Sequence, residues 1–345
     1  MQRRKFIKNV AVTGSMAMVM PKVWSSPLIT GKSDKLGSIL PMRPLGKTGE
    51  DVTIFCLGGA HARRAATEKE TQAIIETAIE KGVRLFDNAW TYGKGHAEEM
   101  YGKYLTPKYR DEIFLYTKTK SYTSADAKKQ LEDSLRRMKT EMIDLWLMHE
   151  VRTGQDVEGR LDEGILEVML KAQQDGKVRH LGFSGHTHSS AHRKLMERVA
   201  GKDPFVACQL PVNPVDAVKP DSFTNELVPD LVKQGYGVIA MKTLAHGRFF
   251  KKHTKKYNFE DHVVPNNLSL EEVFHFVLSQ PVASICSGCT SLDELKENVD
   301  AISRFSKLSE EELLTITEKV AKFAMVPKLE YYRPEPGTYT SEAPI

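Results

Sequence analysis

The chain has 345 residues, of which 41% are hydrophobic and 27% charged, and its formal net charge at pH 7 is +4. Residues 1–35 hold seven basic side chains and one acidic one, a charge of +6, so the rest of the chain carries −2. Because the positive excess lies in the N-terminal segment, the composition argues against a body that binds nucleic acid or an anionic membrane. The length allows one large α/β domain or two ordinary ones, and four cysteines are too few for a disulfide scaffold.

The N-terminal segment has the order of features found in signal peptides. Arg3-Arg4 is followed by Phe6-Ile7-Lys8 and by a short apolar stretch over residues 10–20. This order resembles the twin-arginine signal of bacteria. The resemblance implies that the twin-arginine export machinery carries the folded protein to the periplasm; the alternative is a basic tail on a cytoplasmic protein. No Ala-x-Ala cleavage site follows, and we assign residues 1–35 to this leader.

Beyond the leader, the glycine-punctuated segment Arg43–Val52 predicts a hairpin. Eight short β-branched or aromatic runs then alternate with amphipathic segments. The predicted strands are Thr53–Leu57, Val83–Asp87, Ile113–Lys118, Ile143–His149, Val178–Ser184, Val206–Pro211, Gly237–Met241 and Ala283–Ser287. The predicted helices are Thr67–Lys81, His96–Leu105, Ser124–Lys139, Glu163–Asp175, Ser189–Val199, Asn225–Gln234, Ser269–Ser279 and Ser291–Phe305. Ser309, with Glu312 three residues later, forms a capping-box pattern that opens a further helix to about Phe323.

Eight strand–helix units predict an α/β fold with parallel strands and right-handed crossovers, and they fit the ~250 residues of a (β/α)8 TIM barrel. The alternative is a doubly wound open sheet. That fold favours a G-x-G-x-x-G turn after its first strand, where this chain has Leu57-Gly58-Gly59-Ala60-His61. We therefore expect a leader to residue 35, a barrel over residues 36–325 with the hairpin covering its bottom and an extra C-terminal helix, and a tail over 326–345.

Ionisable side chains end three consecutive predicted strands. Asp87, Lys118 and His149 stand at these ends, and Tyr92 follows Asp87 in the next loop. Barrel active sites lie at the C-terminal ends of the strands, and neighbouring strands are ~4.8 Å apart. Any one of these residues alone has an ordinary structural interpretation. Together they predict a shared site, because burying unpaired charges is costly.

The motifs around these residues resemble those of the aldo-keto reductase family. They are Arg84-Leu85-Phe86-Asp87-Asn88-Ala89-Trp90-Thr91-Tyr92-Gly93, Thr117-Lys118 and Asp144-Leu145-Trp146-Leu147-Met148-His149, within a resemblance that runs from about Met42 to Ala301. The resemblance implies a (β/α)8 barrel, reversible nicotinamide-dependent reduction of aldehydes or ketones, and a catalytic group of Asp87, Tyr92, Lys118 and His149.

The chemistry of carbonyl reduction explains these residue types. A positioned acid must protonate the carbonyl oxygen as hydride reaches the carbon, and Tyr92 can serve. We expect the Lys118 ammonium to lower the pKa of Tyr92 and Asp87 to keep Lys118 charged. A neutral His149 can hydrogen-bond the substrate oxygen and orient it.

The resemblance also implies that NADP(H) or NAD(H) lies across the barrel mouth. Ser184 and Gln209 match contacts to the nicotinamide carboxamide, although Gly185 replaces the usual Asn, and Met241 stands where a Tyr commonly stacks. Further cofactor contacts are expected at Lys242, Leu244, Gly247, Arg248, Gly288, Ser291, Glu294, Glu297 and Asn298. Gly288 and Glu294 stand where NADP-using members have Lys and Arg. A carboxylate there would favour NAD(H) unless Glu294 only caps Ser291, so the choice of dinucleotide stays open.

Two alternative functions remain. The spacing of His186, His188 and His192 is compatible with a metal-dependent barrel hydrolase, and a barrel that binds nicotinamide without turnover would be a sensor or partner subunit. We expect no metal ion, and no iron–sulfur cluster because the tail has no cysteine. The expected partner besides the export machinery is a small carbonyl or alcohol substrate, bound by a monomer or small homo-oligomer. Expected pocket walls are His61, Trp90, Glu150 and His186, which suit a polar, sugar-like substrate.

Overall fold

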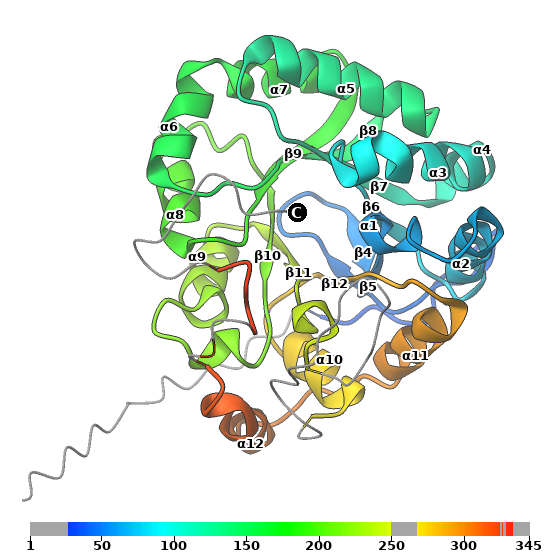
Figure 1. Ribbon diagram of the computed structural model, residues 1–345, viewed down its shortest axis with the longest axis vertical. Coiled ribbons are helices and arrows are strands. Elements are labelled where there is room, and N and C mark those ends of the chain that lie inside the picture. Colours follow the sequence, from blue (N-terminus) through cyan, green and yellow to red (C-terminus); the bar gives the residue numbers. More distant parts are fainter. Residues whose placement is uncertain (1–26, 250–267, 325, 327–328, 334–345) are drawn as a thin grey trace, which may run out of the picture.

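The computed structural model describes residues 27–249, 268–324, 326 and 329–333. Eight parallel strands form a closed barrel with helices around it (Figure 1), as the alternation of strands and helices predicts. Each strand pairs with the next in chain order, and the last pairs with the first through Cys286 and Cys56. The barrel strands are β5 (Phe55–Gly58), β6 (Leu85–Asp87), β7 (Phe114–Thr119), β8 (Ile143–Met148), β9 (Val178–Ser184), β10 (Ala207–Pro211), β11 (Gly237–Met241) and β12 (Ser284–Ser287).

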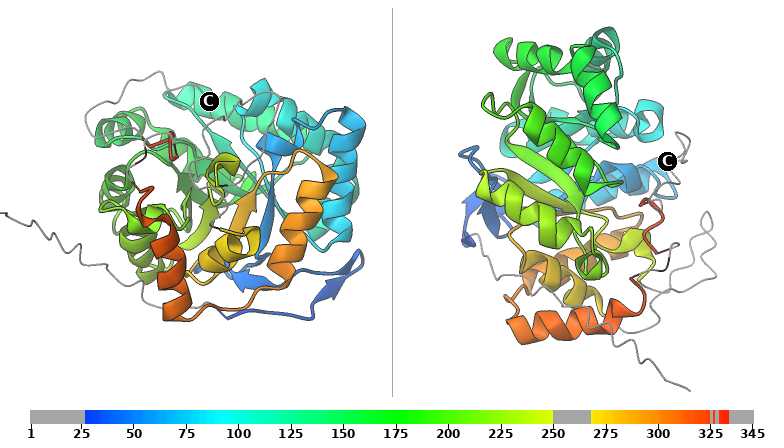
Figure 2. Two further views of the ribbon diagram at one scale, coloured as in Figure 1. Left: turned by 60° about the horizontal axis from the view of Figure 1, so that its bottom comes forward. Right: turned by 90° about the vertical axis from the view of Figure 1, so that its left-hand side faces the viewer.

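The helices follow the predicted segments, mostly within a few residues. They are α1 (Gly59–Ala62), α2 (Glu68–Glu80), α3 (His96–Tyr104), α4 (Thr106–Tyr109), α5 (Ser124–Met138), α6 (Gly154–Asp162), α7 (Ile165–Gln174), α8 (Ser189–Arg198), α9 (Val228–Lys233), α10 (Leu270–Leu278), α11 (Leu292–Ser303) and α12 (Glu310–Ala321). Helix α12 is the predicted extra helix, and it lies along the outside of α10 (Figure 2). The short helices α1, α4 and α6 are not among the predicted elements; α6 begins at Thr153, whose hydroxyl accepts from the Asp156 amide.

The predicted hairpin covers the bottom of the barrel. It consists of β3 (Met42–Pro44) and β4 (Asp51–Thr53), which pair antiparallel. Leu45, at its turn, is fully buried with the side chains that fill the barrel interior. Arg43 is buried too, and its guanidinium donates to the carbonyl oxygens of Leu278 and Val282 at 2.8 Å. The hairpin is therefore bound to the barrel by both apolar and polar contacts.

The last residues assigned to the leader pack on the barrel. Strands β1 (Ser33–Asp34) and β2 (Gly37–Ser38) form a second small hairpin, and Ile29 pairs with Met42. The Asp34 carboxylate receives two hydrogen bonds from the buried Arg84 guanidinium, at 2.7 and 3.0 Å. The twin-arginine motif itself lies outside the described residues, as do residues 334–345 of the tail. Within the described ranges, no helix is long and apolar enough to cross a membrane.

A cavity of about 640 Å³ lies at this bottom end, far from the C-terminal ends of the strands. Its lining includes Arg110 and Arg179, which both pair with the buried Asp144 carboxylate, at 2.9 and 3.4 Å. These contacts join the N-terminal ends of β7, β8 and β9, so we interpret the charged groups as structural.

Candidate active site

The structure brings the four predicted catalytic residues together at the mouth of the barrel. Lys118 is 1% exposed at the end of β7, and its ammonium is paired with the Asp87 carboxylate from the neighbouring β6. Its Nζ lies 3.4 Å from the Tyr92 hydroxyl and 4.9 Å from the centre of that ring. The His149 and Tyr92 rings meet edge to face, with centroids 5.8 Å apart. One ammonium therefore connects a carboxylate with a phenol, and an imidazole lies beside the phenol.

The acid–base properties of Tyr92 differ from the expectation. Burial raises the pKa of Tyr92 well above its ordinary value, and the negative charge of Asp87 adds to this effect. Lys118 was expected to lower that pKa, but its ammonium is engaged by Asp87 and by the Asn88 carbonyl oxygen at 2.7 Å. A tyrosine is already a neutral phenol at physiological pH, and the raised pKa keeps Tyr92 in this form, which can donate a proton.

His149 is held as a neutral imidazole. Burial lowers its pKa well below the ordinary value, although the Glu150 carboxylate opposes the shift. Its backbone is fixed on both sides, because its amide donates to the Thr119 carbonyl at 2.8 Å and its carbonyl accepts from Arg160 at 2.7 Å. The ring atom Nδ1 is buried without a hydrogen-bond partner among the described residues. A neutral, positioned imidazole can donate or accept one hydrogen bond at a substrate oxygen.

Glu150 adds a second charge to the mouth, in a strained conformation. Its φ of +53° lies in the left-handed region, where a residue with a Cβ costs about 1–3 kcal/mol. The side chain is 5% exposed and pairs with Lys120 at 2.8 Å and with Arg152. Burial would raise the pKa of Glu150, but the hydrogen bond and positive charge of Lys120 lower it below its usual range, so the group is a carboxylate. Strain of this kind is found at functional sites, where surrounding contacts maintain it.

Two buried polar atoms test whether a nicotinamide carboxamide fits the mouth. Ser184 Oγ and Gln209 Oε1 have no hydrogen-bond partner within the described ranges, although both side chains are at most 2% exposed. Gln209 Nε2 donates to the Tyr116 hydroxyl at 3.0 Å, which fixes the amide and leaves its oxygen as an acceptor. A hydroxyl donor and an amide acceptor together match the acceptor and donor of a carboxamide. The residues present therefore fit the group.

The packing around residue 185 explains why this chain has Gly185 where an Asn is usual. A Cβ at this position would lie 2.4 Å from the Val151 carbonyl oxygen and 2.7 Å from the His192 ring. His192 is fully buried, and its ring packs against Phe183 and Phe223. The large imidazole thus fills the space that a side chain at residue 185 would need.

The loop after β11 is strained and basic. Lys242, Ala245 and His246 have φ values of +56°, +46° and +59°, three non-glycine residues in the left-handed region within five positions. Lys242 Nζ lies 2.5 Å from His246 Nε2, and burial lowers the pKa of Lys242 to about 8. His246 Nδ1 lies 2.6 Å from the Tyr331 hydroxyl of the tail. Lys242 thus brings an ammonium to the mouth, while Met241, Leu244, Gly247 and Arg248 are partly exposed around it.

The loop after β12 is occupied mainly by its own contacts. The Glu294 carboxylate accepts from the Thr290 amide and hydroxyl at 2.7 and 2.9 Å, and its amide donates to Ser291 Oγ. Asn298 is buried and donates to Ser287 Oγ and Cys289 Sγ. Only half of the predicted capping box is present, because Ser291 accepts from the Glu294 amide while the Glu294 carboxylate binds Thr290 and not the Ser291 amide. Glu294 is nevertheless engaged at its helix N-terminus, and this weakens the argument that it repels a phosphate. Glu297 is exposed beyond this loop.

The expected pocket residues His61 and His186 lie at the mouth with Glu150, whereas Trp90 packs against a helix. The His61 ring covers Gly288, where an added Cβ would lie 2.2 Å from its Nδ1, and it meets His246 edge to face at 5.8 Å. His186 Nδ1 lies 3.3 Å from the Tyr332 carbonyl oxygen. Trp90 contacts α5 instead, with its indole N–H on Asp133 at 3.3 Å and its ring beneath Arg137.

The histidines of the metal hypothesis have separate partners. His186 contacts the tail, whereas His192 Nδ1 lies 3.1 Å from the His188 carbonyl oxygen. In the part of the chain that the structure describes, no three His, Cys, Asp or Glu side chains converge as a metal site would require. The geometry therefore gives the hydrolase alternative no support.

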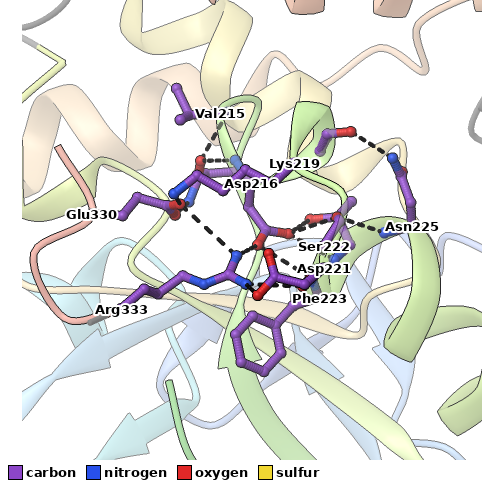
Figure 3. Close-up of polar contacts among 12 residues, drawn as sticks. Val215, Asp216, Lys219, Asp221, Ser222, Phe223, Asn225, Glu330 and Arg333 are labelled. Atoms are coloured by element: carbon purple, nitrogen blue, oxygen red, sulfur yellow. Dashed lines mark hydrogen bonds and ion pairs between the residues drawn. The ribbon is translucent and has the colours of Figure 1, made fainter. Parts of the chain in front are cut away.

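The C-terminal segment is attached to the mouth by a largely buried polar cluster, whose charged members are labelled in Figure 3. We call it the tail clamp: Asn213, Asp216, Lys219, Asp221, Glu330, Tyr332 and Arg333. Arg333 pairs with Asp216 at 2.5 Å and with Asp221 at 2.6 Å, and Lys219 pairs with Glu330 at 2.6 Å. Asp216 is fully buried and also accepts from the Thr224 amide and hydroxyl at 2.7 Å. The clamp places Tyr331 and Tyr332 against His246 and His186.

Sequence reasoning did not identify His246, Asn88, Tyr116 or the tail clamp. His246 could have been found, because it lies in the loop after β11, beside the expected cofactor contacts Lys242, Leu244 and Gly247. Asn88 contributes its carbonyl oxygen to Lys118, a backbone contact that carries no residue signal. The clamp joins residues 117 positions apart, and no local pattern in the sequence indicates such a pairing.

Comparison with known proteins agrees with this geometry. A model of the Aldo/keto reductase family matches residues 55–329. The chain is 27% identical over 306 residues to an uncharacterized oxidoreductase of Bacillus subtilis (strain 168), covering 79% of this chain and 94% of that protein. It is 26% identical over 329 residues to the L-glyceraldehyde 3-phosphate reductase of Escherichia coli (strain K12), covering 81% of this chain and 92% of that protein.

Solved structures share the same fold. An aldo-keto reductase from Bacillus halodurans in its holo form matches with a TM-score of 0.67 at 22% identity, covering 81% of this chain and 95% of that chain. A thermostable aldo-keto reductase in complex with the inhibitor epalrestat matches with a TM-score of 0.63 at 25% identity, covering 81% of this chain and 99% of that chain. Because the family model spans most of the chain and the barrel is complete, the protein is an oxidoreductase that belongs to the aldo/keto reductase family.

Proposed function

We propose that this protein reversibly interconverts a carbonyl and an alcohol with a nicotinamide dinucleotide, and that Tyr92 is its general acid and base. One observation carries the proposal: the Tyr92 hydroxyl lies 3.4 Å from the Lys118 ammonium, which is itself paired with Asp87 inside the mouth of the barrel. An ion pair that only stabilised the fold would need Lys118 and Asp87 but no phenol beside them. It matches what protonation of a developing alkoxide requires.

The side chains divide the work as follows. Neutral Tyr92 donates its proton to the carbonyl oxygen during reduction, and Lys118 stabilises the resulting tyrosinate across the 3.4 Å contact. Asp87 pairs with Lys118 and holds its side chain beside the Tyr92 hydroxyl. His149 donates a hydrogen bond that orients the substrate oxygen toward Tyr92. In the oxidative direction the same contacts let Tyr92 accept the alcohol proton.

The dinucleotide, when bound, supplies or accepts the hydride. Ser184 and Gln209 are the residues that would hold its carboxamide, since their unpaired atoms are complementary to that group. Met241 can lie against the nicotinamide ring as a polarizable surface, and Lys242 and Arg248 place positive charge where phosphates would pass. The Glu294 carboxylate is engaged by Thr290, so it gives no ground for excluding the extra phosphate of NADPH. Titration with NADH and with NADPH measures which of the two is preferred.

Purified protein tests this proposal directly. We expect carbonyl-dependent oxidation of NADH or NADPH over a panel of polar aldehydes and ketones. The E. coli relative is named for reduction of L-glyceraldehyde 3-phosphate, and that compound belongs in the panel with non-phosphorylated sugars. Binding of dinucleotide without turnover over the whole panel would favour the alternative, a sensor or partner subunit.

We further propose that the chain is exported by the twin-arginine route and acts in the periplasm. The support is Arg3-Arg4 with Phe6-Ile7-Lys8. Because Ile29 and Asp34 take part in the fold, cleavage is expected before Ile29. Replacing Arg3 and Arg4 by Lys should retain the full-length protein in the cytoplasm, as measured by fractionation and N-terminal sequencing. An unchanged distribution would favour the cytoplasmic alternative.

A further inference from the structure

Two cysteines that are 230 positions apart in the sequence lie side by side inside the barrel. Cys56 on β5 and Cys286 on β12 are register partners where the first strand pairs with the last. Both belong to the cluster of side chains that fills the barrel interior, whereas Cys208 and Cys289 belong to the layer between barrel and helices. Register partners on neighbouring parallel strands project to the same side of the sheet. The two thiols therefore face each other within one interior layer.

The spacing of the strands allows these thiols to form a bond. Neighbouring strands are ~4.8 Å apart, and Cα–Cα distances in disulfides span roughly 4.4–6.8 Å. The Cys286 thiol is within hydrogen-bonding reach of the Cys56 thiol. Burial is the largest cause that raises the pKa of Cys56, and the contact with Cys286 is the second largest. By contrast, the motif Cys286-Ser287-Gly288-Cys289 does not bring its own cysteines together, because Cys289 lies in the outer layer beside Asn298.

The pair opens on the catalytic mouth. Cys56 is fully buried, but Cys286 is partly exposed. The Cys286 sulfur lies beside Gly58, the last residue of β5, at the C-terminal end of that strand: a Cβ added at Gly58 would be 3.5 Å from Cys286 Sγ. The charge of a Cys286 thiolate would act on both Tyr92 and Lys242. A small oxidant that enters the mouth can thus reach the partly exposed Cys286, and the buried Cys56 lies next to Cys286.

We propose that Cys56 and Cys286 are a redox-active pair that closes to a disulfide when a peroxide enters the mouth. The Cys286 thiol releases its proton, its sulfur attacks one peroxide oxygen and the O–O bond breaks. Cys286 becomes a sulfenic acid, and the departing hydroxide takes up the released proton and leaves as one water. The Cys56 thiol then attacks the Cys286 sulfur, the S–O bond breaks, and a second water carries away the oxygen. Two thiols are oxidised and one hydrogen peroxide is reduced to two waters, so no further reactant is needed.

The disulfide would act on the neighbouring cofactor contacts. Cys56 Sγ lies 3.5 Å from the Tyr116 hydroxyl, and that hydroxyl accepts from Gln209 Nε2 at 3.0 Å. Oxidation removes the thiol hydrogen of Cys56 and draws its sulfur toward Cys286, so the contact with Tyr116 changes. Only this consequence rests on the proposed nicotinamide site; the bond itself does not.

Thiol mapping of the full-length protein tests the pair. The reduced protein, freed of reductant, is treated with hydrogen peroxide, unfolded, alkylated and digested for mass spectrometry. We expect two of the four thiols to be lost, one cross-linked peptide that joins Cys56 to Cys286, and full reversal by dithiothreitol. A different cross-link, or four thiols that all remain alkylatable, would overturn the proposal.

Variants separate the two steps, and the wild-type result stands if a variant fails to fold. Cys56→Ser should stop at a sulfenic acid on Cys286 that dimedone traps, and Cys286→Ser should keep its three thiols. Cys289→Ser is the matched control and should form the disulfide as the wild-type protein does. Dimedone labelling of another cysteine in Cys56→Ser would contradict the assigned order of attack.

A second arm uses the cofactor. Saturating NAD+ or NADP+, whichever shifts the melting temperature, should slow disulfide formation several-fold because the nicotinamide would cover Cys286. A bound dinucleotide that leaves the rate unchanged would contradict the placement of the pair beneath the cofactor. If neither dinucleotide binds, the proposed function fails while the thiol mapping still decides the disulfide.

Discussion

The contacts and the acid–base properties of single residues at the mouth depend on the groups packed around them. Lys118 is buried at 1% exposure, and its side-chain nitrogen pairs with the Asp87 carboxylate and donates to the Asn88 carbonyl oxygen. The sequence places Lys118 and Asp87 at strand ends and so predicts their proximity. It does not predict the pKa of Tyr92, because that depends on how completely tertiary packing buries the phenol.

Replacing the phenol tests its role. Tyr92→Phe should lower carbonyl reduction by about 10²–10⁴-fold, the range expected for loss of a general acid. Dinucleotide affinity should be unchanged, because Ser184 and Gln209 lie on other strands. Steady-state turnover and a fluorescence titration of dinucleotide measure the two effects. A variant that keeps most of its turnover would remove Tyr92 from the mechanism.

Two partly buried histidines at the barrel mouth predict how the fold responds to acid. Burial lowers the pKa of His61 and of His186 to about 3. In the unfolded chain each binds a proton near pH 6.5, so below that pH the unfolded state holds more protons and stability falls as pH falls toward 3. Each histidine should cost about 1.4 kcal/mol per pH unit in this window. Urea denaturation between pH 7 and pH 4 measures the slope.

A variant isolates one histidine. His186→Asn keeps a donor for the Tyr332 carbonyl oxygen, because its amide nitrogen takes the place of Nδ1. The fold should therefore persist while the pH slope decreases by one proton. An unchanged slope would show that His186 is protonated in the folded state.

At the scale of elements, the tail clamp attaches the C-terminal segment to the loop after β10 (Figure 3). The predicted strands and most helices follow from local periodicity and caps; Ser309 and Glu312, for example, form the expected capping box at α12. The clamp does not follow from any local pattern, since Asp216 and Arg333 meet only because the closed barrel brings their segments to the same rim.

Removal of the clamp's cation should be costly. Arg333→Met leaves the fully buried Asp216 carboxylate without its guanidinium, a change expected to destabilise by about 3–5 kcal/mol. It should also raise KM, since Tyr331 and Tyr332 would no longer be held against His246 and His186. Denaturation curves and steady-state kinetics measure both effects.

Arg304→Ala provides the matched control. Its partner Glu271 and Arg304 itself are 43% and 60% exposed, so loss of this pair should cost only about 0–1 kcal/mol. Equal effects of the two substitutions would show that the clamp adds nothing beyond a surface ion pair.

At the scale of the whole molecule, the strand ends of a closed barrel form one site from β6, β7, β8, β9 and β10. A dinucleotide that binds only this assembled mouth should stabilise the fold by about 2.7 kcal/mol at 100-fold its Kd. Thermal unfolding with NADH and NADPH measures this effect, and Ser184→Ala should reduce it because the unpaired Ser184 Oγ is a predicted contact. A melting temperature that neither dinucleotide raises would contradict the cofactor assignment.

The sequence by itself determined the eight strand–helix units, the hairpin, the extra helix and the strand-end positions of Asp87, Lys118 and His149. These follow from patterns within a few residues, and barrel geometry then fixes which strand ends are neighbours. Only the tertiary structure decided that the pKa of Tyr92 is raised and not lowered, that the His192 ring occupies the space beside Gly185, and that Cys56 faces Cys286. Burial and contacts between distant segments set these properties, and neither leaves a periodic signal in the sequence.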